Sequence, residues 1–224
     1  MAAKGWRNML CGVAVLAAAL PAGAAVCVAG SVGSYVALGA TGCTVGGLTF
    51  SDFVVDAFPG PTAQQIAPGS LSLAPIAGGF TLASRAGIVA EAGDLFGFRL
   101  LFDVFGPSLT GGTVAFGPDR SATGDGVLTA LLDAGSSGHA IALVIDGFED
   151  TPASFLSTAV GHYAAFLELG IDGGTDGTAA LGPELASLTF AAGTIAPVPE
   201  PQIALLTLSG LAVLIARRRR AVAA

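Results

Sequence analysis

Residues 94–105 read DLFGFRLLFDVF, and this stretch decides the fold that we expect. Large apolar residues occupy every second position, with small, polar or mixed residues between them. The first set is Phe96, Phe98, Leu100, Phe102 and Val104, and the second is Gly97, Arg99, Leu101 and Asp103. Successive side chains of a β-strand point to opposite faces, so the pattern predicts a strand with one buried face.

Similar short runs recur on both sides of this strand, separated by turn signals such as Gly124-Asp125-Gly126. Two of them repeat the alternation: residues 139–148, with Ile141, Leu143 and Ile145 as the apolar set, and residues 163–171, with Ala165, Leu167 and Leu169. Further candidate strands are 44–53, 71–76, 79–84, 127–132 and 185–191. No helical stripe lies between residues 25 and 196. The sequence therefore predicts an all-β domain over 25–196, with an antiparallel, sandwich-like arrangement.

The composition excludes one class of partner. Hydrophobic residues make up 53% of the chain and charged residues only 11%, against about 25% charged residues in ordinary soluble domains. Between residues 25 and 199, three arginines stand against fifteen acids, and lysine is absent. Nucleic acid binding needs cationic contacts to phosphate, so we expect no nucleic acid partner.

Residues 1–24 have the three parts of a secretory signal peptide. Lys4 and Arg7 supply the positive start, residues 9–20 form an apolar run, and Pro21 ends it. The small residues Ala22-Gly23-Ala24 follow, and they predict cleavage before Ala25.

Two cysteines remain after the leader, Cys27 and Cys43, sixteen positions apart. In an exported protein such a pair indicates a disulfide. Two free buried thiols are the alternative.

The C-terminal segment, residues 197–224, has the features of a membrane anchor. A proline-rich stretch contains Pro199, Glu200 and Pro201, and residues 203–216 follow without a charge. Fourteen helical residues span about 21 Å, less than the roughly 30 Å of a bilayer core, so a buried globular helix is the alternative. The anchor is closed by four consecutive basic residues: Arg217, Arg218, Arg219 and Arg220. Such a cluster favours a transmembrane helix with the arginines in the cytoplasm and the main domain outside it.

This order of Pro-Glu-Pro, apolar helix and arginine cluster at the terminus resembles the PEP-CTERM sorting tail, which is also labelled an ice-binding protein C-terminal domain. The resemblance covers about the last 26 residues, from Pro199. It implies recognition by an exosortase, with Pro199, Glu200 and Pro201 as the sorting motif, and a host that makes exopolysaccharide or biofilm matrix.

The middle of the chain offers little that predicts catalysis. Ser136, Ser137 and His139 lie close together, but the Gly-x-Ser-x-Gly spacing of a nucleophile elbow is absent. Asp146, Glu149 and Asp150 could serve a glycosidase, yet no tryptophan remains after the leader to stack on sugar rings. Asp172 and Asp176 are weak calcium candidates on a glycine-rich loop, and turn chemistry explains the same residues.

We therefore expect a non-catalytic protein without a cofactor, exported and anchored in the inner membrane with its domain in the periplasm. It would then be sorted by an exosortase to the cell surface or matrix. Membrane lipid and the exosortase are the expected partners, and exopolysaccharide is a further candidate. A carbohydrate- or ice-binding module on the same anchor, or a secreted hydrolase, is the alternative.

Overall fold

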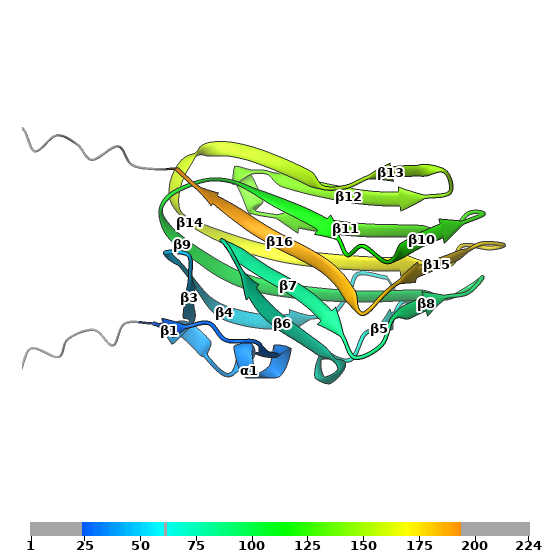
Figure 1. The fold of residues 1–224 in the computed structure, drawn as a ribbon, viewed down its shortest axis with the longest axis horizontal. Helices are drawn as coiled ribbons and strands as arrows, with labels where there is room; N and C mark the ends of the chain where they lie inside the picture. The colour runs from blue at the N-terminus through cyan, green and yellow to red at the C-terminus, as the bar shows by residue number, and fades with distance from the viewer. Residues whose placement is uncertain (1–23, 61, 194–224) are drawn as a thin grey trace, which may run out of the picture.

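Two long strands organise the domain in the computed structural model, which describes residues 24–60 and 62–193. Strands β9 (Leu95–Phe116) and β14 (Ala153–Asp172) pair antiparallel along nearly their whole lengths. The pairing shifts register between Leu156 and His162, opposite the Gly106-Pro107 step of β9. Pro107 has no backbone N–H to donate to the ladder, so the pairing is interrupted there and the strand bends. Because both strands bend there, each contributes to two layers (Figure 1).

The two layers face each other as a sandwich-like arrangement of mostly antiparallel strands. The first layer runs in the order β13 (Phe148–Asp150), β12 (His139–Ile145), β11 (Val127–Asp133), the C-terminal part of β14, the N-terminal part of β9, β4 (Leu48–Asp56), β3 (Cys43–Val45) and β1 (Ala25–Val26). The second runs in the order N-terminal part of β14, C-terminal part of β9, β16 (Glu184–Ala192), β7 (Gly79–Ser84), β6 (Leu71–Ile76) and β2 (Gly30–Ser31).

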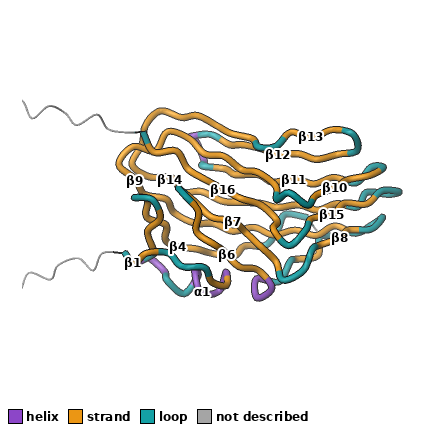
Figure 2. The backbone as a smooth tube through the Cα atoms, viewed as in Figure 1, coloured by secondary structure: helices purple, strands orange, loops and turns teal. Residues whose placement is uncertain are grey.

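Smaller elements complete the domain (Figure 2). A separate three-stranded sheet runs in the order β10 (Arg120–Thr123), β15 (Thr178–Leu181) and β8 (Ile88–Ala90). Strand β5 (Gln64–Gln65) pairs parallel with the start of β9. The helices are short: α1 (Val32–Val36) and the 3-10 turns η1 (Gly39–Thr41), η2 (Pro68–Ser70) and η3 (Gly135–Ser137).

Aromatic rings join the two layers. The Phe50 ring, on β4, lies 4.8 Å from the Phe80 ring on β7, and the Phe102 ring on β9 lies 6.0 Å from that of Phe190 on β16. All four side chains are buried. Edge-to-face and tilted ring pairs such as these add to the stabilisation that burial provides.

Most of the expected strands are present. Strands β6 and β7 have the predicted bounds, and β11 and β16 extend their predictions by one or two residues. The alternation in β9 is confirmed, because Phe98, Leu100, Phe102 and Val104 are buried, while Phe96 is only half-buried. In β14 the predicted apolar set, residues 165, 167 and 169, is also buried.

Two strand predictions are wrong in detail. Residues 44–53 are not one strand: β3 and β4 form a hairpin at Gly46-Gly47, whose φ angles of 57° and 85° suit glycine in a tight turn. Residues 139–148 also divide, at Asp146-Gly147, into β12 and β13. The inner face of β12 is moreover the opposite of the predicted one, because Ala140, Ala142 and Val144 are buried.

The all-β, antiparallel prediction is confirmed for the described residues. Within residues 24–60 and 62–193 no helix has the length and apolar character needed to cross a bilayer. Residues 1–23 of the predicted signal peptide, residues 194–196 of the predicted domain, and the predicted transmembrane helix at 203–216 lie outside the described residues.

Candidate functional sites

The residues predicted to direct sorting cannot be placed in the structure. Pro199, Glu200 and Pro201, together with the arginines 217–220, lie outside the described residues. The structure does describe the two chain ends that lead to these segments. Strand β1 begins at Ala25, and β16 ends at Ala192. Both lie at the same end of the sandwich (Figure 1).

The predicted disulfide between Cys27 and Cys43 is present, with a Cα–Cα distance of 4.9 Å. It joins the residue after β1 to the first residue of β3, and both cysteines are buried. From β1 the chain passes to β2 at the edge of the other layer and then into α1. Residues 25–36, which we call the N-terminal strap, therefore cross the open edge between the two layers, and the disulfide fixes them there.

Buried side chains of α1 hold the other end of the N-terminal strap. Val32 and Tyr35 are buried, and the Tyr35 ring lies 5.2 Å from Phe53 of the first layer and 5.3 Å from Phe80 of the second. The Tyr35 hydroxyl donates to the carbonyl of Val28 at 2.7 Å. Burial raises the pKa of Tyr35, so the phenol stays protonated and keeps this donor role.

The serine and histidine candidates do not form a catalytic arrangement in the described part of the chain. Ser136 and Ser137 lie in η3, and His139 is exposed at the start of β12. His162 does meet an acid: its Nε2 lies 2.9 Å from Asp103 Oδ1. The other neighbour of the His162 ring is Phe105, stacked at 4.5 Å. A Ser–His hydrolase needs a nucleophile on the histidine, and neither ring has one among the described contacts.

The acidic cluster at the β12–β13 hairpin is exposed. Asp146, Glu149 and Asp150 lie at this hairpin, and Glu149 is held by Arg120, whose Nη2 lies 2.7 Å from Glu149 Oε2. A second Arg120 nitrogen, Nη1, donates to the Gly117 carbonyl at 2.9 Å. The pair therefore ties β10 to β13, and we interpret the cluster as solvated turn residues.

The calcium candidates lie in a loop whose carboxylates already have partners. Asp172 Oδ1 accepts from the Gly174 N–H at 2.8 Å. Asp125, from the neighbouring turn, accepts from the N–H and the hydroxyl of Thr175 and from the N–H of Asp176. The Thr175 hydroxyl, with these backbone N–H groups, lowers the pKa of Asp125 well below its usual range. Asp172 and Asp176 do not join a third ligand: among the described residues no group of three His, Cys, Asp or Glu side chains could hold a metal.

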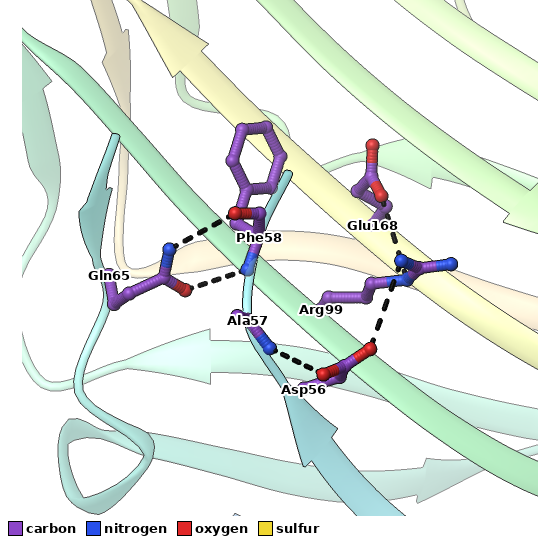
Figure 3. A network of polar contacts seen from close by, with 6 residues as sticks. All are labelled: Asp56, Ala57, Phe58, Gln65, Arg99 and Glu168. Carbon is purple, nitrogen blue, oxygen red and sulfur yellow. Dashed lines mark hydrogen bonds and ion pairs between the residues drawn. The ribbon is translucent and has the colours of Figure 1, made fainter. Parts of the chain in front are cut away.

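A polar network on the outer face of the first layer was not predicted from the sequence (Figure 3). Arg99 lies between two acids, with Nη1 3.8 Å from Asp56 Oδ2 and Nε 3.7 Å from Glu168 Oε2. Its guanidinium also covers the Phe166 ring, 4.3 Å from the centroid. Burial raises the pKa of Glu168, and the nearby Arg99 charge opposes part of that rise.

Next to this network, the Phe58 ring fills a slot between two glycines. A Cβ added to Gly97 would lie 2.1 Å from the ring, and one added to Gly170 would lie 3.3 Å from it. The Gln65 amide fixes the Phe58 backbone, accepting from its N–H at 2.9 Å and donating to its carbonyl at 3.4 Å (Figure 3). Arg99 is paired with Asp56 and Glu168 within the chain, although its buried Nε has no hydrogen-bond partner among the described residues. Because both acids and the Gln65 amide come from this chain, we interpret the network as structural.

Comparisons of the chain with protein-family models, with curated proteins and with solved structures found no match.

Proposed function

We propose that the chain is a non-catalytic surface or matrix protein, exported through its leader and held in the inner membrane by its C-terminal tail. An exosortase then sorts or processes it in an exopolysaccharide or biofilm context. Residues 1–24 act as the signal peptide, residues 203–216 as the membrane helix, and the arginines 217–220 as the cytoplasmic stop. Recognition rests with Pro199, Glu200 and Pro201.

The Cys27–Cys43 disulfide is the observation that carries this proposal. Structural disulfides persist in oxidising compartments and are rare in the cytosol, so its presence supports export. The start of β1 at Ala25 supports cleavage before that residue, since cleavage there leaves every described element intact. The absence of a nucleophile on either described histidine supports a role other than hydrolysis.

Intact-mass analysis of the exported protein tests the proposal. We expect an N-terminus at Ala25 and a C-terminus near the Pro-Glu-Pro motif, without the arginine cluster. Replacing Pro199, Glu200 and Pro201 together by alanine should leave the C-terminus uncut. The matched control, Pro197→Ala, changes a proline of the same linker outside the motif and should be processed normally.

Two other results would contradict parts of the proposal. A native protein that keeps Arg217–Arg220 after export would be a plain single-pass membrane protein. A full-length protein found free in the cytosol with its leader attached would contradict export itself.

One observation favours a second candidate, the carbohydrate- or ice-binding module. Uncharged, small side chains form registered rows on the outer face of the second layer. One row joins Ser154, Thr113 and Thr189, and the next joins Ala115, Ser187 and Thr81. Neighbouring strands place such residues about 4.8 Å apart, which gives a regular hydroxyl array.

Binding to insoluble polysaccharide or to ice tests this second candidate. Thr189→Lys places a bulky charge in the middle of the rows and should abolish binding if the face is used. Ser121→Lys adds the same charge at an exposed position of β10 and should leave binding unchanged. Equal behaviour of the two variants would contradict the candidate.

A further inference from the structure

The two ends of the sandwich differ in charge. We call the end with β1 and the last residues of β16 the anchor end, and the opposite end, with β8, β10 and β15, the distal end (Figure 1). Turns 91–94, 117–126, 146–150 and 172–176 carry nine of the fifteen acids of the described residues. Turns 46–47, 77–78, 106–108 and 157–161 carry none. The first set lies at the distal end and the second at the anchor end, as the direction of the strands requires.

Apolar side chains are most exposed at the anchor end. Leu156, at 86%, and Val26, at 75%, are the two most exposed large apolar side chains of the described residues. Leu156 and Ala191 of β16 lie opposite Gly111 from the two sides of β9, which places Leu156 two strands from the point where the chain leaves the domain. Exposed single apolar residues are ordinary, but the two most exposed ones lie at the end whose turns carry no acid, and together they indicate a contact surface.

Strand pairing extends this surface across the first layer. Val26 is opposite Thr44, Thr44 is opposite Thr49, and Thr49 is opposite Phe105, so the four form one row on the outer face. Phe105 is 42% exposed. The row ends one residue before turn 106–108, where the Ser108 carbonyl accepts from the Gly193 N–H at 2.6 Å. The row therefore reaches from the start of the domain to its C-terminal exit.

A hollow opens beside this row, between the edges of the two layers. Val26, Val45, Pro75 and Ile76 line it, with Thr44 as a polar neighbour. Its lining residues include no charged side chain. An uncharged, apolar concavity at the anchor end suits acyl chains better than it suits a polar ligand.

The length of the tail limits where the anchor end can be. Nine residues, 194–202, lie between Gly193 and Ile203, the first residue of the proposed membrane helix. Even fully extended, they reach no more than about 35 Å. The tether therefore keeps the anchor end next to the bilayer at a high effective concentration, where a small apolar surface suffices for contact.

We infer that the anchor end is a lipid-docking surface, which rests on the bilayer through Val26, Phe105 and Leu156 while the acidic distal end points away. This inference rests on the proposed membrane anchor and adds the orientation of the domain to it. Charge supports that orientation, because anionic lipid repels the acidic turns of the distal end, whereas the turns of the anchor end carry no acid and Asp103, near Phe105, is paired with His162. The anchor end has no described lysine or arginine, so docking should depend little on salt.

A single-tryptophan experiment on the mature chain, residues 25–224, tests the inference. Removal of the leader removes Trp6, the only tryptophan of the sequence, so an introduced one is a unique probe. Leu156→Trp places it at the anchor end. The matched control, Val89→Trp, places it at a 52%-exposed position of β8 at the distal end. Both proteins are reconstituted into phosphatidylcholine–phosphatidylglycerol vesicles, with and without brominated acyl chains.

We expect brominated lipid to quench the fluorescence of the Leu156→Trp variant at least about threefold more than that of Val89→Trp, because interfacial apolar groups lie roughly 5–10 Å into the headgroup boundary. Equal quenching at the two positions would overturn the inference. A blue-shifted emission of the Leu156→Trp variant that brominated lipid leaves unquenched, and that reverts when the protein is diluted in lipid, would also overturn it in favour of a contact between two copies.

Vesicle flotation after carbonate washing separates this inference from the proposed anchor. Protein that floats with the vesicles but shows no preferential quenching keeps the anchor and loses the docking surface. Protein that does not float overturns the anchor, and the docking surface with it. Thermal unfolding of both variants, compared with the unsubstituted chain, confirms that the substitutions leave the fold unchanged.

Discussion

Removal of the disulfide should weaken the domain through the N-terminal strap. The Cys27→Ala/Cys43→Ala variant opens a loop of sixteen residues. In the chain-entropy model, closing a loop of this size stabilises the folded state by about 3 kcal/mol. A domain of this size loses roughly 2–4 °C in Tm for each kcal/mol, so the variant should unfold about 6–12 °C lower than the unsubstituted protein.

Alanine is the suitable replacement, because Cys27 and Cys43 are buried and serine would bury two hydroxyl groups. Calorimetry and urea unfolding of the mature protein measure the change. Reduction of the unsubstituted protein should reproduce most of it, which separates the loss of the cross-link from the loss of two sulfur atoms. The reductant should have no effect on the double variant.

A difference of less than about 0.5 kcal/mol, within the range of neutral surface substitutions, would refute this reasoning. It would mean that the packing of Val32 and Tyr35 between the layers holds the N-terminal strap without help. Hydrogen exchange would then show equal protection of β3 and β4 in both proteins. We expect instead that their amides exchange faster in the variant, because β1 pairs with β3 only through the segment that the disulfide fixes.

Three further substitutions test the outer-face contacts and the turns. Phe58→Ala empties the slot over Gly97 and Gly170. Because the ring is only half-buried, the variant should lose about 2 kcal/mol of unfolding free energy, measured with urea. The control Phe148→Ala, at an exposed position, should lose less than about 0.5 kcal/mol. Asp125→Asn should destabilise the protein at neutral pH. The pKa of Asp125 is lowered in the folded state, so the contribution of Asp125 to stability is present above the unfolded pKa of about 3.9 and is lost as the pH falls through the folded pKa. The unfolding free energies of the variant and the unsubstituted protein, plotted against pH, should therefore converge in acid. Glu168→Gln should have the opposite pH dependence, because burial raises the pKa of Glu168 in the folded state. The contribution of Glu168 to stability is present below the unfolded pKa of about 4.3 and is lost as the pH rises through the folded pKa. The urea midpoint of the unsubstituted protein should therefore fall over this pH range, and that of the glutamine variant should not.

The sequence predicted strands well where one face was clearly more apolar than the other. In β9 the alternation of large apolar residues with Arg99 and Asp103 leaves one choice of buried face, and that choice is confirmed. The full length of β9 was not predictable in the same way, because Gly106-Pro107 reads as an end. The strand continues because β14 and β16 pair with the residues after the bend, and these partners are remote in the sequence.

Strand β12 shows where alternation alone fails. Both of its faces are apolar, one with Ile141, Leu143 and Ile145 and the other with Ala140, Ala142 and Val144. Size favours the first face for the core, and the structure buries the second. The reason lies in the neighbouring strand: Leu132 of β11 is paired with Ala140 and is itself buried, so a small partner fits beside it at the density of a packed interior.

The slot that holds Phe58 could not be read from the sequence either. Gly97 and Gly170 come from strands far apart in the chain, and only the register of β9 with β14 places them opposite each other. Glycine within a strand does signal a close approach of another group, so the two positions carried a hint of the slot. Nothing in the sequence identified Phe58 as the group that approaches.

The segregation of charge between the two ends follows from topology and local composition together. Successive turns of antiparallel strands fall at alternate ends of a sandwich, so the composition of each turn acts on one end only. Gly46-Gly47 and Ala77-Gly78 are tight turns that need glycine for its positive φ, and they could have carried an acid beside it, as Asp146-Gly147 does. Turn geometry therefore does not explain why acids are missing from the turns of one end. The missing acids are explained if the two ends have different surroundings, with the distal end facing water and the anchor end facing the bilayer to which the tail leads.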